Sequence, residues 1–222
     1  MDGTGELFHD LVSALPNGFN ITIVGYPCDR FLADAESLQA AREAFPATER
    51  FVILAESYST PLAVRLGAST PFNLAGLILC SGFVNSPISG WRRSLLSVAA
   101  PFAFRMPLPR SVARRWLVGG DAPETLVDAV CSAVAKVRSE VMTARLREIF
   151  HCDVRREFAQ VAVPIVYLQA SRDRLVDPSA LDEMRLIKPD LNFVRIDGPH
   201  LILQRQAQKG AQVIADFVRA LS

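Results

Sequence analysis

A serine, an aspartate and a histidine stand where hydrophobic runs of the sequence end. Ser57 follows the run 51–55, Asp173 follows the run 164–168, and His200 follows the run 192–196. A serine hydroxyl attacks a carbonyl at neutral pH only when an adjacent base accepts its proton. A histidine that is oriented by an aspartate supplies such a base. The three residues therefore predict acyl transfer, with Ser57 as nucleophile, His200 as base and Asp173 as the acid that orients it.

The sequence around Ser57 is typical of a sharp turn between a strand and a helix. Residues 55–59 read Ala-Glu-Ser-Tyr-Ser, and Thr60-Pro61 opens a helical pattern. Such a turn exposes the serine and needs small residues on both sides, usually as G-x-S-x-G. Ala55 and Ser59 replace the glycines here, and both are small enough for the turn to form.

Other aspartates and histidines compete for the two remaining roles. Asp177 is followed by Pro178, which fits a helix N-cap with proline at the first helical position, so Asp173 is the preferred acid. His9 falls within a helical pattern and His151 lies at the end of another. His200 is therefore the histidine expected at Ser57.

Strand-like runs alternate with amphipathic stretches along most of the chain. The apolar runs lack polar alternation, as in strands that are buried on both faces of a parallel sheet. They cover residues 21–24, 51–55, 74–79, 164–168 and 192–196. The helical patterns between them cover 6–15, 33–44, 61–67, 178–187 and 201–221. This alternation predicts an α/β fold with a mostly parallel open sheet and helices on both faces.

One long segment interrupts the alternation. Residues 83–160 contain helical patterns around 91–100, 111–118 and 123–150 and no convincing strand. A connection of that length is expected to form a subdomain. The predicted division is a core of 1–82 and 161–222 with a helical insertion at 83–160.

Composition narrows the class of protein. The 222 residues carry a net charge of +1, and half of them are hydrophobic. Nothing in that balance predicts a nucleic-acid partner. The apolar runs are far shorter than the roughly 20 residues of a membrane-spanning helix, and the first residues show no signal peptide. A cytoplasmic protein without a membrane span is expected.

With these motifs in place, the chain resembles the α/β-hydrolase superfamily, and in particular small bacterial carboxylesterases and thioesterases with a helical cap. Asp2-Gly3-Thr4-Gly5 resembles the H-G-x-G segment of that family, with Asp2 in place of the histidine. The resemblance implies that the backbone N–H groups of Thr4 and Tyr58 form the oxyanion hole. It also implies that 83–160 is the cap and that no metal or organic cofactor is required.

The resemblance also implies strands before the Asp2–Gly5 segment, and because only Met1 precedes that segment here, those strands are expected to be absent. The family's strand before the oxyanion segment lies between the strands that correspond here to 21–24 and 51–54. Without it, a sheet of about five strands is expected, in which Ile21–Val24 pairs beside Phe51–Leu54. A homodimer is expected to cover the apolar surface left exposed.

The substrate is suggested by the start of the insertion. Trp91, Phe102 and Met106 are expected to bind an acyl or aryl group, although they could instead form the insertion's own core. Six arginines and no acid lie within 91–120. They form either a solvated face or a site for an anion such as a coenzyme A phosphate. The expected substrate is a short to medium acyl ester; the alternatives are an acyl-thioester, or a weakened hydrolase fold that only binds its ligand.

Overall fold

The computed structural model describes residues 1–88 and 90–221, with no description of the Arg92 side chain. Four strands form its sheet: β1 (Phe51–Glu56), β2 (Leu74–Cys80), β3 (Ile165–Ala170) and β4 (Asn192–Ile196). They pair in parallel in the order β1-β2-β3-β4. The helices before β2 are the 3-10 turns η1 (Glu6–Phe8) and η2 (Ser57–Ser59) and the helices α1 (His9–Ala14), α2 (Asp34–Glu43) and α3 (Thr60–Ala68).

The remaining helices follow β2. Those between β2 and β3 are α4 (Gly90–Ala103), α5 (Arg110–Val112), the π-helical turn η3 (Ala113–Val118), α6 (Glu124–Ala135), α7 (Ser139–His151) and α8 (Arg155–Gln160). Those after β3 are α9 (Ser179–Ile187), α10 (Ile202–Arg205) and α11 (Ala207–Ala220).

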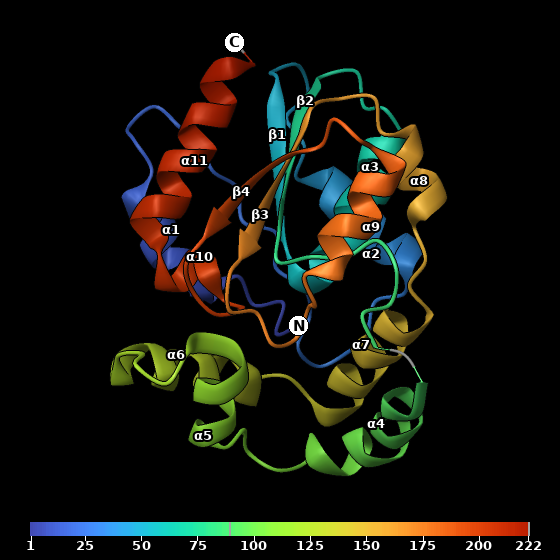
Figure 1. The fold of residues 1–222 in the computed structure, drawn as a ribbon, viewed down its shortest axis with the longest axis vertical. Coiled ribbons are helices and arrows are strands. Elements are labelled where there is room, and N and C mark those ends of the chain that lie inside the picture. Colours follow the sequence, from blue (N-terminus) through green and yellow to red (C-terminus); the bar gives the residue numbers. More distant parts are fainter. Residues whose placement is uncertain (89, 222) are drawn as a thin grey trace.

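Helices cover both faces of the sheet, as predicted (Figure 1). Within β2, Leu77 and Leu79 belong to one core with residues of α3, α8 and α9, whereas Ile78 belongs to the other core with residues of α1, α10 and α11. Alternate side chains thus enter opposite cores, which explains why the sequence of β2 is apolar throughout.

The predicted strand at 21–24 is absent, and the prediction of its pairing with 51–54 is wrong. Residues 20–25 form no strand, and β1 is an edge of the four-stranded sheet. This segment lies instead against residues 3–5: Ile23 contacts Gly5, and the N–H of Tyr26 donates to the carbonyl of Gly3 at 2.8 Å. Ile21 and Ile23 are exposed, so no buried face holds the segment in the sheet.

The helices α4–α7 lie beyond the carboxyl ends of the strands (Figure 1). The expected insertion extended to residue 160, but α8 packs on α3, and its Phe158 belongs to the core beside the sheet. Leu146, Ile149 and Phe150 of α7 belong to that same core, and the extent of the expected insertion, 83–160, stays a prediction. None of the described helices has the length and apolar character needed to cross a membrane.

Candidate active site

Ser57 occupies the turn between β1 and α3 in a conformation that side chains rarely adopt. Its φ is +56°, in the left-handed region. A non-glycine residue there is strained, and such strain persists only where the surroundings impose it. The strand enters the turn from one side, and the 3-10 turn η2 leads directly into α3 on the other. The turn predicted at 55–59 is present, with Ser57 at its tip.

Ser57, His200 and Asp173 form a continuous chain of hydrogen bonds. The Nε2 atom of His200 lies 2.8 Å from Ser57 Oγ, and its Nδ1 lies 2.8 Å from Asp173 Oδ2. The side chains of His200 and Asp173 are buried. Three residues that are far apart in the sequence thus meet at the carboxyl edge of the sheet, where loops after parallel strands converge.

The loops after β3 and β4 hold the acid and the base in register. The N–H of Ser171 donates to the carbonyl of Ile196 at 2.9 Å, and the N–H of Arg172 donates to the carbonyl of Gly198 at 2.8 Å. These two bonds fasten the loop that carries Asp173 to the loop that carries His200. The relative position of the two side chains is therefore set by backbone.

Asp173 is further fixed by its own loop. Its Oδ1 accepts the N–H groups of Leu175 at 2.8 Å and Val176 at 3.0 Å, which leaves Oδ2 for His200. Asp177 is exposed, and its Oδ1 accepts the N–H of Ser179 at 3.0 Å. That bond lowers the pKa of Asp177. The two aspartates therefore differ in place: one contacts the histidine, and the other caps α9.

The other two histidines lie elsewhere. His9 is exposed and contacts Asp10 at 3.3 Å. His151 is exposed at the end of α7, where its Nδ1 lies 2.8 Å from the carbonyl oxygen of Arg147. Neither ring has Ser57 as a partner.

The two expected oxyanion donors differ in their availability. Tyr58 lies in the first turn after β1, where a backbone N–H has no acceptor within its own helix. The N–H of Thr4 instead donates to Asp2 Oδ1 at 3.0 Å, and the Thr4 hydroxyl donates to the same oxygen at 2.7 Å. A local turn with Asp2 thus engages the Thr4 N–H, and the role of that N–H in an oxyanion hole stays a prediction.

Sequence reasoning missed Glu56, the residue immediately before Ser57. Its Oε2 accepts a hydrogen bond from Gln204 Nε2 at 2.9 Å, and burial raises the pKa of its carboxyl to about 6. Gln204 is on α10, four residues after His200. The bond thus joins the end of β1 to the element that follows the histidine. A glutamate next to a serine gives no such signal in the sequence, because burial depends on the fold.

Arg145 is a second residue that the sequence did not single out. It is buried on α7, and its Nη1 donates to the carbonyls of Met1 and Asp2, both at 2.7 Å. Its Nη2 donates to the carbonyl of Pro27 at 3.0 Å. One side chain of α7 therefore joins two backbone segments, residues 1–2 and residue 27.

A cavity of about 190 Å³ adjoins the turn at Ser57. Tyr58 and Ser59 line it, whereas Ser57 and His200 do not, so the cavity lies to one side of the hydrogen-bonded chain. The rest of its wall comes mainly from α2, α3 and α7, including Asp34, Arg65, Arg145, Glu148 and Ile149. Arg65 and Asp34 form an ion pair at 2.7 Å. The cavity is thus polar along one wall.

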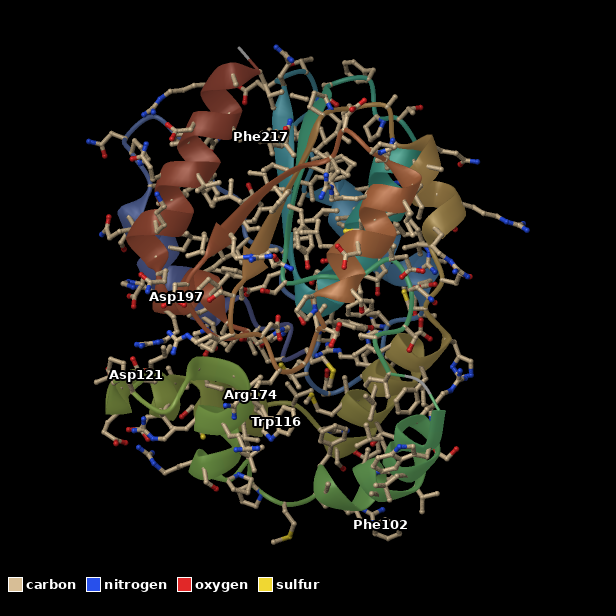
Figure 2. The ribbon with its side chains drawn as sticks, viewed as in Figure 1. Phe102, Trp116, Asp121, Arg174, Asp197 and Phe217 are labelled. Carbon is tan, nitrogen blue, oxygen red and sulfur yellow. The ribbon has the colours of Figure 1, made fainter. Side chains whose placement is uncertain are left out.

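The three residues expected to bind substrate lie outside this cavity. Trp91, Phe102 and Met106 are 72%, 66% and 69% exposed, and none of them lines the cavity. Figure 2 shows Phe102 at the outer side of α4, away from the sheet. Their role in binding substrate therefore stays a prediction, and Ala100 is the buried residue among the described side chains of α4.

The comparison with known families agrees with this geometry. Residues 26–188 match the family model Hydrolase_4, which is described as serine aminopeptidase, S33. The chain belongs to this hydrolase family. The matched range contains Ser57 and Asp173 but ends before His200.

Solved structures show that the hydrolase has the α/β-hydrolase fold. A hydrolase from Oleispira antarctica superposes with a TM-score of 0.83 at 11% identity, covering 99% of this chain and 88% of that one. A malate-bound esterase from Thermogutta terrifontis gives 0.81 at 17% identity, covering 98% and 86%. The esterase RhEst1 from Rhodococcus sp. ECU1013 gives 0.76 at 15% identity, covering 100% and 88%. No curated protein matches the chain.

Proposed function

We propose that this hydrolase is a serine carboxylesterase that cleaves short to medium acyl esters through an acyl-enzyme. The observation that carries the proposal is the chain of 2.8 Å contacts from Asp173 through His200 to Ser57. That chain gives a serine the adjacent base that it needs, and gives the base an orienting carboxylate.

The proposed reaction has two halves. Ser57 Oγ attacks the ester carbonyl as its proton passes to His200 Nε2, and the N–H of Tyr58 donates to the oxyanion that forms. The carbon–oxygen bond to the alcohol then breaks, and His200 returns the proton to the departing oxygen. Water, deprotonated by His200, attacks the acyl-enzyme and releases the acid and free Ser57. Asp173 stays ionised and stabilises the imidazolium in both halves.

The proposal places a small acyl group in the cavity lined by Tyr58, the residue next to Ser57. At about 190 Å³ it slightly exceeds the roughly 150 Å³ of a cavity that holds one benzene molecule. Tyr58, Phe83 and Ile149 supply apolar or aromatic surface, and helices α4–α7 are proposed as a cap above the site. A long acyl chain would have to extend beyond this space.

An acyl-thioesterase would use arginines of 91–120 to bind the phosphates of coenzyme A. In the structure, Arg110 forms ion pairs with Glu124 and Asp128, and Arg114 forms one with Glu124. Guanidinium groups that are already paired attract a phosphate less strongly. This arrangement favours the carboxylesterase.

Kinetics with a series of nitrophenyl esters, from acetate to decanoate, beside acyl-CoA substrates of equal chain length would test the proposal. We expect kcat/KM to be highest at short to medium esters and to exceed that for acyl-CoA. Ser57→Ala should lower kcat by about 10⁴-fold or more. Preference for acyl-CoA would transfer the assignment to the thioesterase. No turnover of either series would favour a ligand-binding protein.

A further inference from the structure

The helix α4 is amphipathic in the reverse of the usual sense. Surface helices normally turn their apolar stripe toward the core. In α4 the outer positions carry large apolar side chains, among them Leu95 at 56% exposed and Val98 at 68% exposed, together with Trp91 and Phe102. Ala100 is the one buried residue among those of α4 whose side chains are described. The side of α4 that faces water is therefore the more apolar one.

These exposed residues form a single stripe. Trp91, Leu95, Val98 and Phe102 follow one another at spacings of four, three and four, which places them on one face of a helix. Met106, just after the helix, is also exposed. Contiguous apolar surface of this kind marks a site of interaction rather than ordinary surface. We call Trp91, Leu95, Val98, Phe102 and Met106 the outer stripe.

The segment that carries the outer stripe is rich in arginine. Residues 83–120 contain six arginines and no acidic residue. Arg105 stacks on the ring of Phe102, within the outer stripe, at 5.6 Å, whereas Arg93 lies over the ring of the buried Phe150 at 5.9 Å, on the inner side of α4. Glu140 of α7 is an exposed acid near Arg105, and Glu124 and Asp128 of α6 are paired with Arg110 and Arg114. The stripe therefore lies in a surface with excess positive charge.

We propose that the outer stripe is a docking face for the surface of an anionic phospholipid bilayer. Exposed Trp, Phe and Leu on one face of a helix, with arginines beside them, match the chemistry of the boundary between head groups and acyl chains. The guanidinium of Arg105, beside Phe102, would pair with a lipid phosphate, and its long side chain would let the apolar stripe enter the boundary while the charge stays at the surface.

A second copy of this chain fits the face less well. A two-fold symmetric contact places the same patch on both partners. The six arginines of 83–120, which outnumber the acids Glu124, Asp128 and Glu140 beside them, would then face their counterparts on the other copy. An anionic bilayer supplies the opposite charge over the whole face. The positive charge of this face thus favours an anionic bilayer over a second copy of the chain.

Vesicle binding tests the proposal independently of any catalytic activity. The protein would be sedimented with vesicles of phosphatidylglycerol and, separately, of phosphatidylcholine, at low and high salt. We expect binding to phosphatidylglycerol at least tenfold stronger than to phosphatidylcholine, with a loss at high salt. In a Trp116→Phe variant, Trp91 is the one tryptophan left, and its emission should shift to shorter wavelength on binding.

A matched pair of variants locates the face. Leu95→Ser with Val98→Ser should lower phosphatidylglycerol binding at least tenfold while leaving the circular dichroism spectrum unchanged. Phe72→Ser with Leu186→Ser removes two apolar residues outside 83–120 that are even more exposed, at 85% and 84%, and should leave binding unchanged. Absence of vesicle binding, or equal effects of the two pairs, would overturn the proposal. So would a dimer in light scattering that Leu95→Ser with Val98→Ser dissociates, since the stripe would then bind a second copy.

Discussion

At the residue scale, replacing Asp173 or Asp177 with Asn should have different effects on kcat, because only Asp173 contacts His200. Asp173→Asn removes the charge that orients His200, so kcat should fall by about 10⁴-fold with little change in stability. Asp177→Asn keeps a side-chain oxygen at the start of α9, so kcat should stay within a few-fold and stability should fall by less than about 1 kcal/mol. Ester hydrolysis and urea unfolding of both variants measure this. The reverse ranking in kcat would make Asp177 the acid.

The raised pKa of the Glu56 carboxyl should make the free energy of unfolding depend on pH. Burial raises its pKa from 4.5 to about 6, so between these values the folded state binds a proton that the unfolded state has released. Unfolding free energy should therefore fall as pH rises from 4.5 to about 6, by about 2 kcal/mol from this group. Glu56→Gln keeps an acceptor for Gln204 and removes the ionisation.

The comparison of Glu56→Gln with the parent protein isolates that effect from other groups that titrate in the same range. Urea titrations between pH 4 and pH 8 give the unfolding free energy of both proteins. As the pH rises, the stability of Glu56→Gln should increase relative to that of the parent protein. A difference that stays constant over this range would show that the carboxyl does not titrate as described.

Some residues of the site could be predicted from their immediate sequence, and others could not. Ser57, Asp173 and His200 each follow an apolar run, so parallel strands alone bring them to one edge. Glu56 and Arg145 acquire their roles from partners far away in the chain, namely Gln204 and the carbonyls of residues 1, 2 and 27. No spacing rule predicts such partners.

At the element scale, Gly82 limits how closely α3 approaches the end of β2. A Cβ atom on Gly82 would lie 2.6 Å from Thr60 Cβ, and Thr60 is buried at the start of α3. Gly82→Ala should therefore displace the first turn of α3, cost about 1–3 kcal/mol, and lower activity by moving Ser57. Gly120→Ala is the control, because a Cβ there meets nothing within 4 Å.

Thermal or urea unfolding of Gly82→Ala and Gly120→Ala measures the stability that each variant loses. The expected order is a clear loss for Gly82→Ala and a change of less than about 1 kcal/mol for Gly120→Ala. Equal stability of the two would mean that β2 and α3 are not in rigid contact at Thr60.

At the scale of the whole molecule, the four strands β1 to β4 and the helices on both faces of the sheet were predicted correctly, whereas the strand predicted at its edge, 21–24, was not. Strands buried on both faces have a distinct composition, and β1 to β4 were all expected. The run 21–24 has the same composition, but a strand forms only where a neighbour accepts its hydrogen bonds, and this segment lies against residues 3–5 instead. β1 thus remains at an edge, where the predicted homodimer could form by strand pairing.

The central claim is that Ser57 is the nucleophile, and covalent labelling tests it most directly. A fluorophosphonate probe reacts with a serine only when a neighbouring base activates it, as His200 is placed to do at 2.8 Å. Digestion and mass spectrometry of the labelled protein should find the adduct on Ser57, and Ser57→Ala should remain unlabelled while keeping its fold. An adduct on another serine, or equal labelling of Ser57→Ala, would contradict the account.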